Sequence, residues 1–256
     1  MARLEIVQVP VLNDNYVYLA HEAESGATAV VDPAVAGPPL EAARARGWTI
    51  THLLNTHHHM DHVGGNLEVK RATGCTVIGP AADEGRIPGL DHGVSEDDTV
   101  RVGNATARVF EVHGHTLGHI MFWFSDSDAL FCGDHLFVMG CGRLTEGTAP
   151  QMWDSLSKLS ALPDTAQIYC AHEYTQNNGA FALTVDPANA DLKRKMAEVA
   201  AARAQNLSTV PSTLGEERRT NPFLRATAAE VAAAVGMAGA PAVEVFAEVR
   251  RRKDLW

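Results

Sequence analysis

The chain has 256 residues, of which 46% are hydrophobic and 20% are charged, and its formal net charge is −10. These values are typical of a globular protein with a substantial core, and the acidic balance argues against nucleic acid as a general partner. No apolar run approaches the roughly 18 residues of a membrane span, and no signal-peptide core follows the N-terminus, so we expect a cytoplasmic protein without a membrane partner. We also expect a monomer. The four cysteines lack paired spacing, which predicts buried free thiols.

Short strands alternate with helices over the first 172 residues. Strands are predicted at Leu4–Pro10, Tyr16–Ala20, Thr28–Val31, Thr49–Asn55 and Thr76–Ile78, and again between about residues 99 and 132. Helices are predicted at Leu40–Arg46, Leu67–Ala72 and Gln151–Leu162. This alternation predicts a layered α/β architecture of sheets and helices.

After His172 the chain becomes rich in alanine and poor in strand patterns. Helices are predicted at Asn189–Ala204, Ala226–Val235 and Val243–Arg252, with Thr227 as the N-cap of the second. All 12 histidines lie at or before His172. Residues 1–172 carry 10 basic and 21 acidic side chains, a net charge of −11, whereas residues 173–256 carry 11 and 10, a net charge of +1. We therefore predict a metal-binding domain at residues 1–172 and a helical domain at residues 173–256.

The run His57-His58-His59-Met60-Asp61-His62 follows a predicted buried strand and precedes a Gly-Gly pair. Four of its six residues fall in the spacing His-x-His-x-Asp-His, which is typical of metal ligands. Imidazole and carboxylate groups suit zinc and related metals, and one mononuclear site with an open position needs only about three protein ligands. Four ligands in one loop therefore indicate two metal ions. The alternative, an accidental surface tract or a tag fragment, is disfavoured because the run lies inside an apolar strand context.

The remaining ligands are expected at the ends of other strands, because loops at one edge of a sheet meet in space. An apolar strand is followed by a ligand type at His115, Asp134 and His172. Our hypothesis has two trios of ligands and a bridging carboxylate: His57, His59 and His115 for one metal, Asp61, His62 and His172 for the second, and Asp134 between them. His58 and Met60 alternate with the ligands, so we expect them to point away and pack. For His119 we consider two roles, orienting a metal ligand and simple packing in the core.

Four segments, the run at residues 57–62 and the strand ends that carry His115, Asp134 and His172, together resemble the metallo-beta-lactamase superfamily. Within it, the whole chain resembles the hydroxyacylglutathione hydrolase (glyoxalase II) family, through Asn13–Tyr16, Gly140–Arg143, Glu146–Thr148, Ala171–Thr175, Thr220–Arg225 and Arg250–Asp254. The resemblance implies a four-layer αββα sandwich followed by a smaller α-helical domain that binds glutathione. It also implies the seven ligands above and two divalent metal ions, with zinc favoured and iron or manganese compatible.

The resemblance further implies four glutathione-binding residues, carried over one at a time as Arg143, Tyr174, Arg250 and Lys253. Arg250 and Lys253 are three residues apart and so share a helix face, whereas the neighbouring Arg251 and Arg252 are expected in solvent. Thr145 stands where the family usually has an aromatic residue, so we expect a contact to glutathione to be lost there.

The implied reaction is hydrolysis of S-(2-hydroxyacyl)glutathione thioesters, chiefly S-D-lactoylglutathione to D-lactate and glutathione, the second step of methylglyoxal detoxification. In this hypothesis a metal-bridging hydroxide attacks the carbonyl, Asp134 holds the metals together, Asp61 orients the nucleophile, and no Ser or Cys nucleophile is needed. Three alternatives stay open. They are another hydrolase of the superfamily such as a lactonase, a glutathione-persulfide dioxygenase with one iron, and a non-catalytic metal-binding or glutathione-binding protein.

Overall fold

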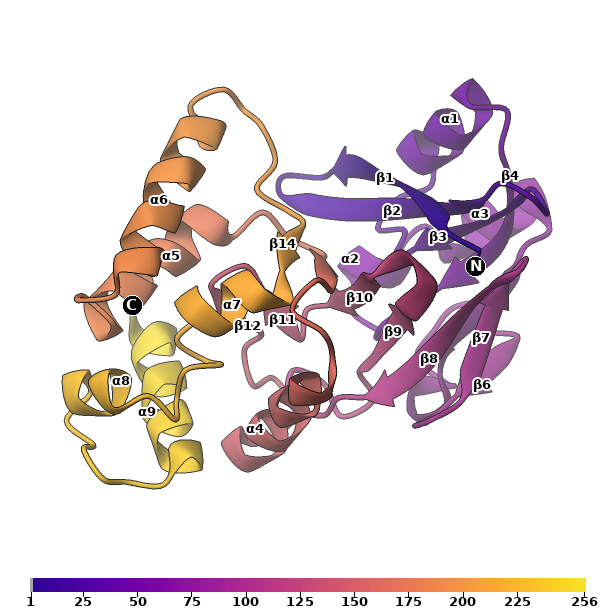
Figure 1. Cartoon of the computed structure of the whole chain (residues 1–256). Coiled ribbons are helices and arrows are strands. Elements are labelled where there is room, and N and C mark those ends of the chain that lie inside the picture. The colour runs from indigo at the N-terminus through magenta and orange to yellow at the C-terminus, as the bar shows by residue number, and fades with distance from the viewer. Residues whose placement is uncertain (1) are drawn as a thin grey trace. The chain divides into compact units, whose positions relative to one another are not determined.

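The computed structural model describes residues 2–256, which form two compact units. Among these residues, the first unit comprises 2–112 and Leu117–Gly133, and the second comprises His113–Thr116 and Asp134–Trp256. This division by contacts differs from the domain boundary predicted at residue 172, which stays a prediction. Figure 1 shows both units, with an element labelled wherever there is room.

The first unit contains a six-stranded mixed sheet in the order β1 to β6. Its strands are β1 (Leu4–Val11), β2 (Asn15–Glu22), β3 (Ala27–Val31), β4 (Thr49–Leu54), β5 (Thr76–Pro80) and β6 (His92–Val94). The strands from β1 to β3 pair antiparallel, whereas those from β3 to β6 pair parallel. Every residue of β2 and β3 is buried, as expected for strands covered on both faces.

Two helices, α1 (Gly37–Ala45) and α3 (Asn66–Thr73), pack against this sheet (Figure 1). Their apolar side chains join the core under β4 and β5, in which Leu53, Val69 and Val77 are fully buried. α3 ends at Gly74, whose φ of 70° is the left-handed conformation that glycine adopts without a steric penalty. The short α2 (Met60–Val63) lies between β4 and α3 in the sequence and belongs to the ligand-rich loop.

Four further strands of the first unit pair antiparallel in the order β10-β9-β8-β7. They are β7 (Thr99–Val102), β8 (Ala105–Glu111), β9 (Ile120–Phe124) and β10 (Ala129–Gly133), and the 3-10 turns η1 (Ala81–Asp83) and η2 (Ser125–Ser127) complete the unit. β8 and β10 both run antiparallel to β9, so their carboxyl ends lie at the same edge. This edge leads into two of the predicted ligand segments.

The second unit is mostly helical. It contains the hairpin β11 (Leu136–Phe137) and β12 (Gly140–Cys141), the pair β13 (Gln167–Cys170) and β14 (Ser212–Thr213), and the 3-10 turn η3 (Lys158–Ala161). Its helices are α4 (Ala149–Ser157), α5 (Thr175–Val185), α6 (Ala190–Arg203), α7 (Leu214–Thr220), α8 (Ala229–Ala234) and α9 (Ala242–Leu255). α5 and α6 pack side by side (Figure 1). No helix in residues 2–256 is both long enough and apolar enough to cross a bilayer.

The sequence patterns locate most of these elements but omit α5 and α7. α5 contains two asparagines and a glycine, which lower helix propensity, and α7 is short and polar. The predicted N-cap at Thr227 is wrong, because α8 begins at Ala229 and Ala228 occupies the cap position. By contrast, α4 begins with a capping box that Thr148 and Gln151 form.

Candidate metal centre and substrate cavity

The histidine run follows β4, and Asp32 follows the neighbouring parallel strand β3. Carboxyl ends of adjacent parallel strands lie at one edge, so the fold brings the two segments together. Oδ1 of Asp32 accepts the Thr56 main-chain N–H at 2.8 Å, and Oδ2 lies 2.7 Å from the Thr56 hydroxyl and 3.1 Å from Nδ1 of His62. All three residues are buried. Asp32 therefore anchors the ligand loop.

These contacts fix the imidazole tautomers. A carboxylate can only accept, so Nδ1 of His62 carries the proton and Nε2 is left as the donor atom for a metal. The Thr56 hydroxyl donates to Asp32, so its oxygen can accept from Nδ1 of His57 at 3.0 Å. His57 thereby has the same tautomer as His62.

The other predicted ligands of this loop lie close to these Nε2 atoms. Nε2 of His57 lies 3.1 Å from Nδ1 of His59, and Nε2 of His62 lies 3.7 Å from Oδ2 of Asp61. Asp61 is held from outside the loop by Asn15, whose amide donates to Asp61 Oδ2 at 3.1 Å. The first unit thus assembles three imidazoles and a carboxylate whose chemistry suits a first-row divalent metal.

Asp32, His57 and His62 also present one donor atom each within 4.8 Å of one another. We assign Asp32 to positioning rather than to ligation, because its oxygens accept a main-chain N–H, a hydroxyl and an imidazole N–H.

The intervening residues differ in their surroundings. His58 turns toward the 3-10 turn η1, where its Nδ1 lies 3.0 Å from Oδ2 of the buried Asp83, which agrees with the expectation that it points away. Met60 is 72% exposed, so the expectation that it packs is wrong.

His119 is buried and its ring stacks on that of His57, with centroids 4.6 Å apart. This contact favours a role in packing against a ligand ring.

The second unit holds the other three predicted ligands. Nε2 of His115 lies 3.5 Å from Oδ2 of Asp134, and Nε2 of His172 lies 3.3 Å from Oδ1 of the same carboxylate. Each oxygen of Asp134 therefore faces a different imidazole, as a bridging carboxylate requires. Nδ1 of His115 lies 2.8 Å from the main-chain carbonyl of Arg143, so this nitrogen carries the proton and Nε2 is the ring atom that could bind a metal.

Asp134 directly follows Gly133, which has a φ of 49°. A Cβ at this position would lie 2.3 Å from Oγ1 of Thr56 and 2.9 Å from Nε2 of His119. Only glycine fits here, because both the backbone conformation and the space exclude a side chain.

A cavity of about 570 Å³ lies wholly within the second unit and opens beside His115 and Asp134. All four predicted glutathione-binding residues line it, together with Asn177 and Asn178. Tyr174 is 37% exposed, and its ring stacks on that of His172 with centroids 4.6 Å apart and an interplanar angle of 3°. The cavity therefore combines two predicted metal ligands with a wall that contains three cations.

The cations of the cavity are held differently. Arg250 is buried, and its guanidinium donates to the Cys141 carbonyl at 3.0 Å and to Asp254 at 2.7 Å. Arg143 is exposed. Burial, together with the nearby guanidinium groups of Arg250 and Arg143, lowers the pKa of Lys253 to about 8. Arg251 is exposed and ion-paired with Glu248, so its predicted place in solvent is confirmed. The same prediction is wrong for Arg252, which is half-buried and donates to the Val235 carbonyl at 2.6 Å.

Two other lining residues bear on the chemistry. Burial raises the pKa of the Cys141 thiol to about 11, so it is not a thiolate nucleophile at neutral pH. The Thr145 hydroxyl donates to the main-chain carbonyl of His115 rather than pointing into the cavity as a free donor.

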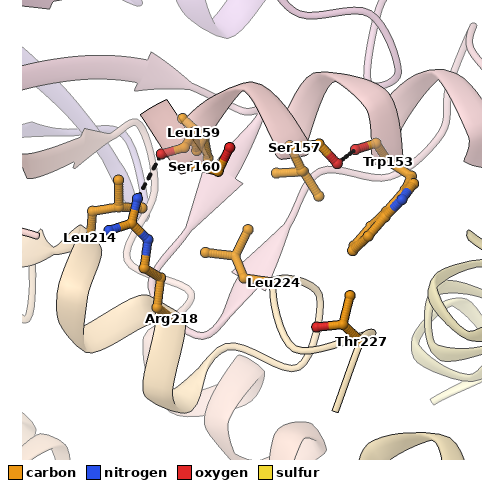
Figure 2. Close-up of a pocket in the computed structure, with 9 residues that line it drawn as sticks. Trp153, Ser157, Leu159, Ser160, Leu214, Arg218, Leu224 and Thr227 are labelled. Carbon is orange, nitrogen blue, oxygen red and sulfur yellow. Dashed lines mark hydrogen bonds between the residues drawn. The ribbon is translucent and has the colours of Figure 1, made fainter. Parts of the chain in front are cut away.

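A second cavity of the second unit, of about 330 Å³, has a mostly apolar wall that includes Trp153, Leu214 and Leu224 (Figure 2). Its one cation, Arg218, donates to the carbonyls of Leu159 and Leu162 at 2.8 Å each. Because those contacts hold the guanidinium, we assign no ligand to this cavity.

Sequence reasoning missed Asp32, Asn15 and Asn177 as residues of the site. Asp32 also ends an apolar strand, and that pattern is the signal that could have found it. The side chain of Asn15 contacts Asp61, and that of Asn177 contacts Lys253. Both partners are distant in sequence, so no sequence pattern predicts these contacts.

Comparisons with known proteins agree with this geometry. A family model described as hydroxyacylglutathione hydrolase C-terminus matches residues 173–256, and a model of the metallo-beta-lactamase superfamily matches residues 11–172. The hydroxyacylglutathione hydrolase of Methylococcus capsulatus is 60% identical over 253 residues, which is 99% of each chain. This chain belongs to the hydroxyacylglutathione hydrolase family. The family member from Rhodospirillum rubrum is 58% identical over 254 residues, again 99% of each chain. The predicted family and the prediction of a metal-dependent hydrolase are confirmed.

Solved structures confirm the fold expected of the hydroxyacylglutathione hydrolase family. ETHE1 from Myxococcus xanthus has a TM-score of 0.71 at 24% identity, covering 96% of this chain and 90% of that one. TTHA1623 in a di-iron-bound form has a TM-score of 0.63 at 22% identity, covering 86% of this chain and 100% of that one. At these identities the likeness supports the metallo-beta-lactamase fold alone.

Proposed function

We propose that this chain hydrolyses S-(2-hydroxyacyl)glutathione thioesters, with S-D-lactoylglutathione as the main substrate and D-lactate and glutathione as products. Membership of the hydroxyacylglutathione hydrolase family supports this reaction. The single observation that supports this reaction most directly is the 570 Å³ cavity, because its wall contains His115 and Asp134 together with Arg143, Arg250 and Lys253. A glutathione thioester has the matching chemistry, since it carries two carboxylates and a reactive carbonyl.

The donor set fits divalent metal ions. In both units, imidazoles have their Nδ1 protons directed to protein acceptors, so that their Nε2 atoms are left for ligation. We propose that His57, His59 and His115 would hold one metal, that Asp61, His62 and His172 would hold the second, and that the Asp134 carboxylate would be shared by both. Zinc is favoured, and iron and manganese are compatible with the same ligands.

The reaction adds the oxygen of water to the acyl carbon and breaks the C–S bond. Divalent metal ions held at such a site acidify water and polarise the carbonyl. In our proposal Oδ2 of Asp61, which Asn15 holds in place, accepts a hydrogen bond from the attacking water and orients it. The sulfur leaves as glutathione thiolate, a good leaving group that needs little help from a general acid. No Ser or Cys side chain forms an intermediate.

We propose that Arg143, Tyr174, Arg250 and Lys253 bind the glutathione portion. Lys253 and Arg143 supply charge to the carboxylates, whereas Arg250 holds the Cys141 carbonyl and so shapes the cavity wall. Residues 173–256 would then form the substrate-binding domain, with residues 1–172 as the metal domain. We also propose that the enzyme is monomeric and cytoplasmic. The four buried free cysteines are typical of a protein from a reducing compartment.

Substrate truncation tests the role of the cations. The ratio of kcat/KM for S-D-lactoylglutathione to that for a lactoyl thioester of N-acetylcysteamine, which lacks both carboxylates, should be large in the unmodified chain. Lys253→Met and Arg143→Met should each raise KM for the glutathione thioester about tenfold, because one charged hydrogen bond contributes about 1.5–3 kcal/mol.

The truncated thioester should be hydrolysed equally well by these variants. Arg251→Met is the matched control, because Arg251 lies on the same helix, is exposed and pairs with Glu248. Equal losses on both substrates, or the same loss in the control, would contradict the proposed binding role.

A further inference from the structure

One short segment of the second unit, residues 142–147, wraps around the turn that carries His115. The main-chain carbonyl of His115 accepts the N–H of Thr145 at 3.2 Å and the N–H of Glu146 at 3.3 Å. The side-chain hydroxyl of Thr145 donates to the same oxygen. Three donors from two adjacent residues therefore converge on one carbonyl of a proposed metal ligand.

The same segment holds His115 at two further points. The carbonyl of Arg143 accepts from the imidazole Nδ1 at 2.8 Å, and the N–H of Gly147 donates to the Gly114 carbonyl at 3.1 Å. Packing is close as well, because a Cβ on Gly147 would lie 2.7 Å from the Cα of Gly114. Main-chain position and ring orientation of His115 are thus both set by residues 143–147.

The segment also touches the second proposed ligand of this unit. A Cβ on Gly142 would lie 2.2 Å from the carbonyl oxygen of Asp134 and 3.0 Å from the Cβ of His115. The segment therefore passes directly over both ligands, and a displacement of its backbone would move the Arg143 carbonyl away from the His115 ring.

We infer that Thr145 is a positioning residue for the metal centre: its hydroxyl ties residues 142–147 to the His115 carbonyl and so keeps His115 in the orientation that retains a metal. This inference rests on the proposed function, in which His115 is a ligand. Thr145 also lines the cavity, which would equally suit a residue that contacts substrate. Its single hydroxyl proton is donated to His115, however, so the side chain offers a substrate only a methyl group and an accepting oxygen.

The two roles predict different measurements. A positioning residue affects metal retention and kcat, whereas a substrate contact affects mainly KM. Thr145→Val removes the hydroxyl at nearly constant shape, Thr145→Ala removes it with the methyl, and Thr145→Ser keeps it. Each full-length variant is loaded with zinc, checked for folding by its thermal transition, and mixed with a chromogenic chelator that reports zinc release.

We expect Thr145→Val and Thr145→Ala to release zinc about tenfold faster than the unmodified chain, the lower end of the loss that follows removal of a group supporting a ligand. KM for S-D-lactoylglutathione should stay within about twofold, and kcat should fall. Thr145→Ser should release zinc as slowly as the unmodified chain and should keep its kcat. A raised KM with unchanged zinc release, or failure of serine to rescue, would overturn the inference.

His115→Ala separates the failure of this inference from that of the proposed ligand set. Loss of zinc in His115→Ala but not in the hydroxyl-free variants overturns the role of Thr145 alone. Full zinc retention in His115→Ala overturns the ligand assignment and the inference with it.

Discussion

Oδ2 of Asp32 lies 3.1 Å from Nδ1 of His62 and 2.7 Å from the hydroxyl of Thr56, which in turn lies 3.0 Å from Nδ1 of His57. One buried carboxylate thus directs the rings of two proposed ligands, the first directly and the second through a hydroxyl. An oriented imidazole of fixed tautomer binds a metal more tightly than one free to rotate, because no orientational freedom is lost on binding.

Asp32→Asn should therefore weaken metal binding without removing a ligand. The amide presents only one accepting oxygen, so it cannot accept all three donors. We expect metal affinity to fall about 10–100-fold in a chelator competition assay, which is the usual cost of losing such a supporting group. Asp83→Asn is the matched control, because Asp83 is equally buried but holds His58, which is not a proposed ligand. Equal losses in both variants would show a general effect of removing buried charge.

The lowered pKa of Lys253 predicts how substrate affinity varies with pH. Its pKa of about 8 means that the ammonium form predominates below pH 8 and the neutral amine above it. Since only the charged form attracts a carboxylate, KM for S-D-lactoylglutathione should rise between about pH 7 and pH 9.

Lys253→Arg tests this cause, because guanidinium stays charged throughout that range. The rise in KM should be absent in this variant. If the pH dependence of KM persists unchanged in Lys253→Arg, Lys253 is not its origin.

The buried Glu217 should make stability depend on pH. Burial raises its pKa above the ordinary value of 4.5, and its Oε2 accepts the Met139 main-chain N–H at 2.7 Å and an Asn221 amide N–H at 3.1 Å. A group with a raised pKa in the fold contributes stability that is complete below its unfolded pKa and is lost as the pH rises toward the folded pKa. The unfolded chain ionises first and is thereby favoured.

Glu217→Gln removes the ionisation and keeps an accepting oxygen. Its free energy of unfolding should match that of the unmodified chain near pH 4 and exceed it at pH 7, with the gap growing by at most about 1.4 kcal/mol per pH unit. Denaturant titrations at several pH values measure this gap. Glu230→Gln, on the exposed face of α8, should show none. A gap independent of pH would mean that the fold does not raise the pKa of Glu217.

The proposed metal ligands could be picked out from the sequence because they follow apolar strands. The run from His57 to His62 and the later His115, Asp134 and His172 all stand at such positions, and the sheet topology brings strand ends to common edges. What the sequence could not show are contacts between residues far apart in the chain. Asp32 was missed because an aspartate before proline also suits a simple turn, so its hold on His62 is visible only in three dimensions.

The second unit was harder to predict than the first. Its helices α5 and α7 contain Asn, Gly and charged residues without a clear apolar period, and tertiary packing stabilises them instead. Arg250 and Lys253 were paired correctly on one helix face, yet spacing alone could not show that Arg250 is buried against Cys141 while Lys253 remains half-buried beside Asn177. At Thr145 the sequence predicted only the loss of an aromatic contact to glutathione. The structure shows that its hydroxyl donates to the main-chain carbonyl of His115.

The most direct test of the binuclear thioesterase is to follow the loss of thioester absorbance with S-D-lactoylglutathione while counting metals in the same sample. The account predicts rapid hydrolysis by protein that holds about two metal ions per chain, and loss of both metals and activity after chelation. Full activity at one metal per chain would contradict the bridged pair at Asp134. No hydrolysis at two metals per chain would contradict the glutathione thioester as substrate.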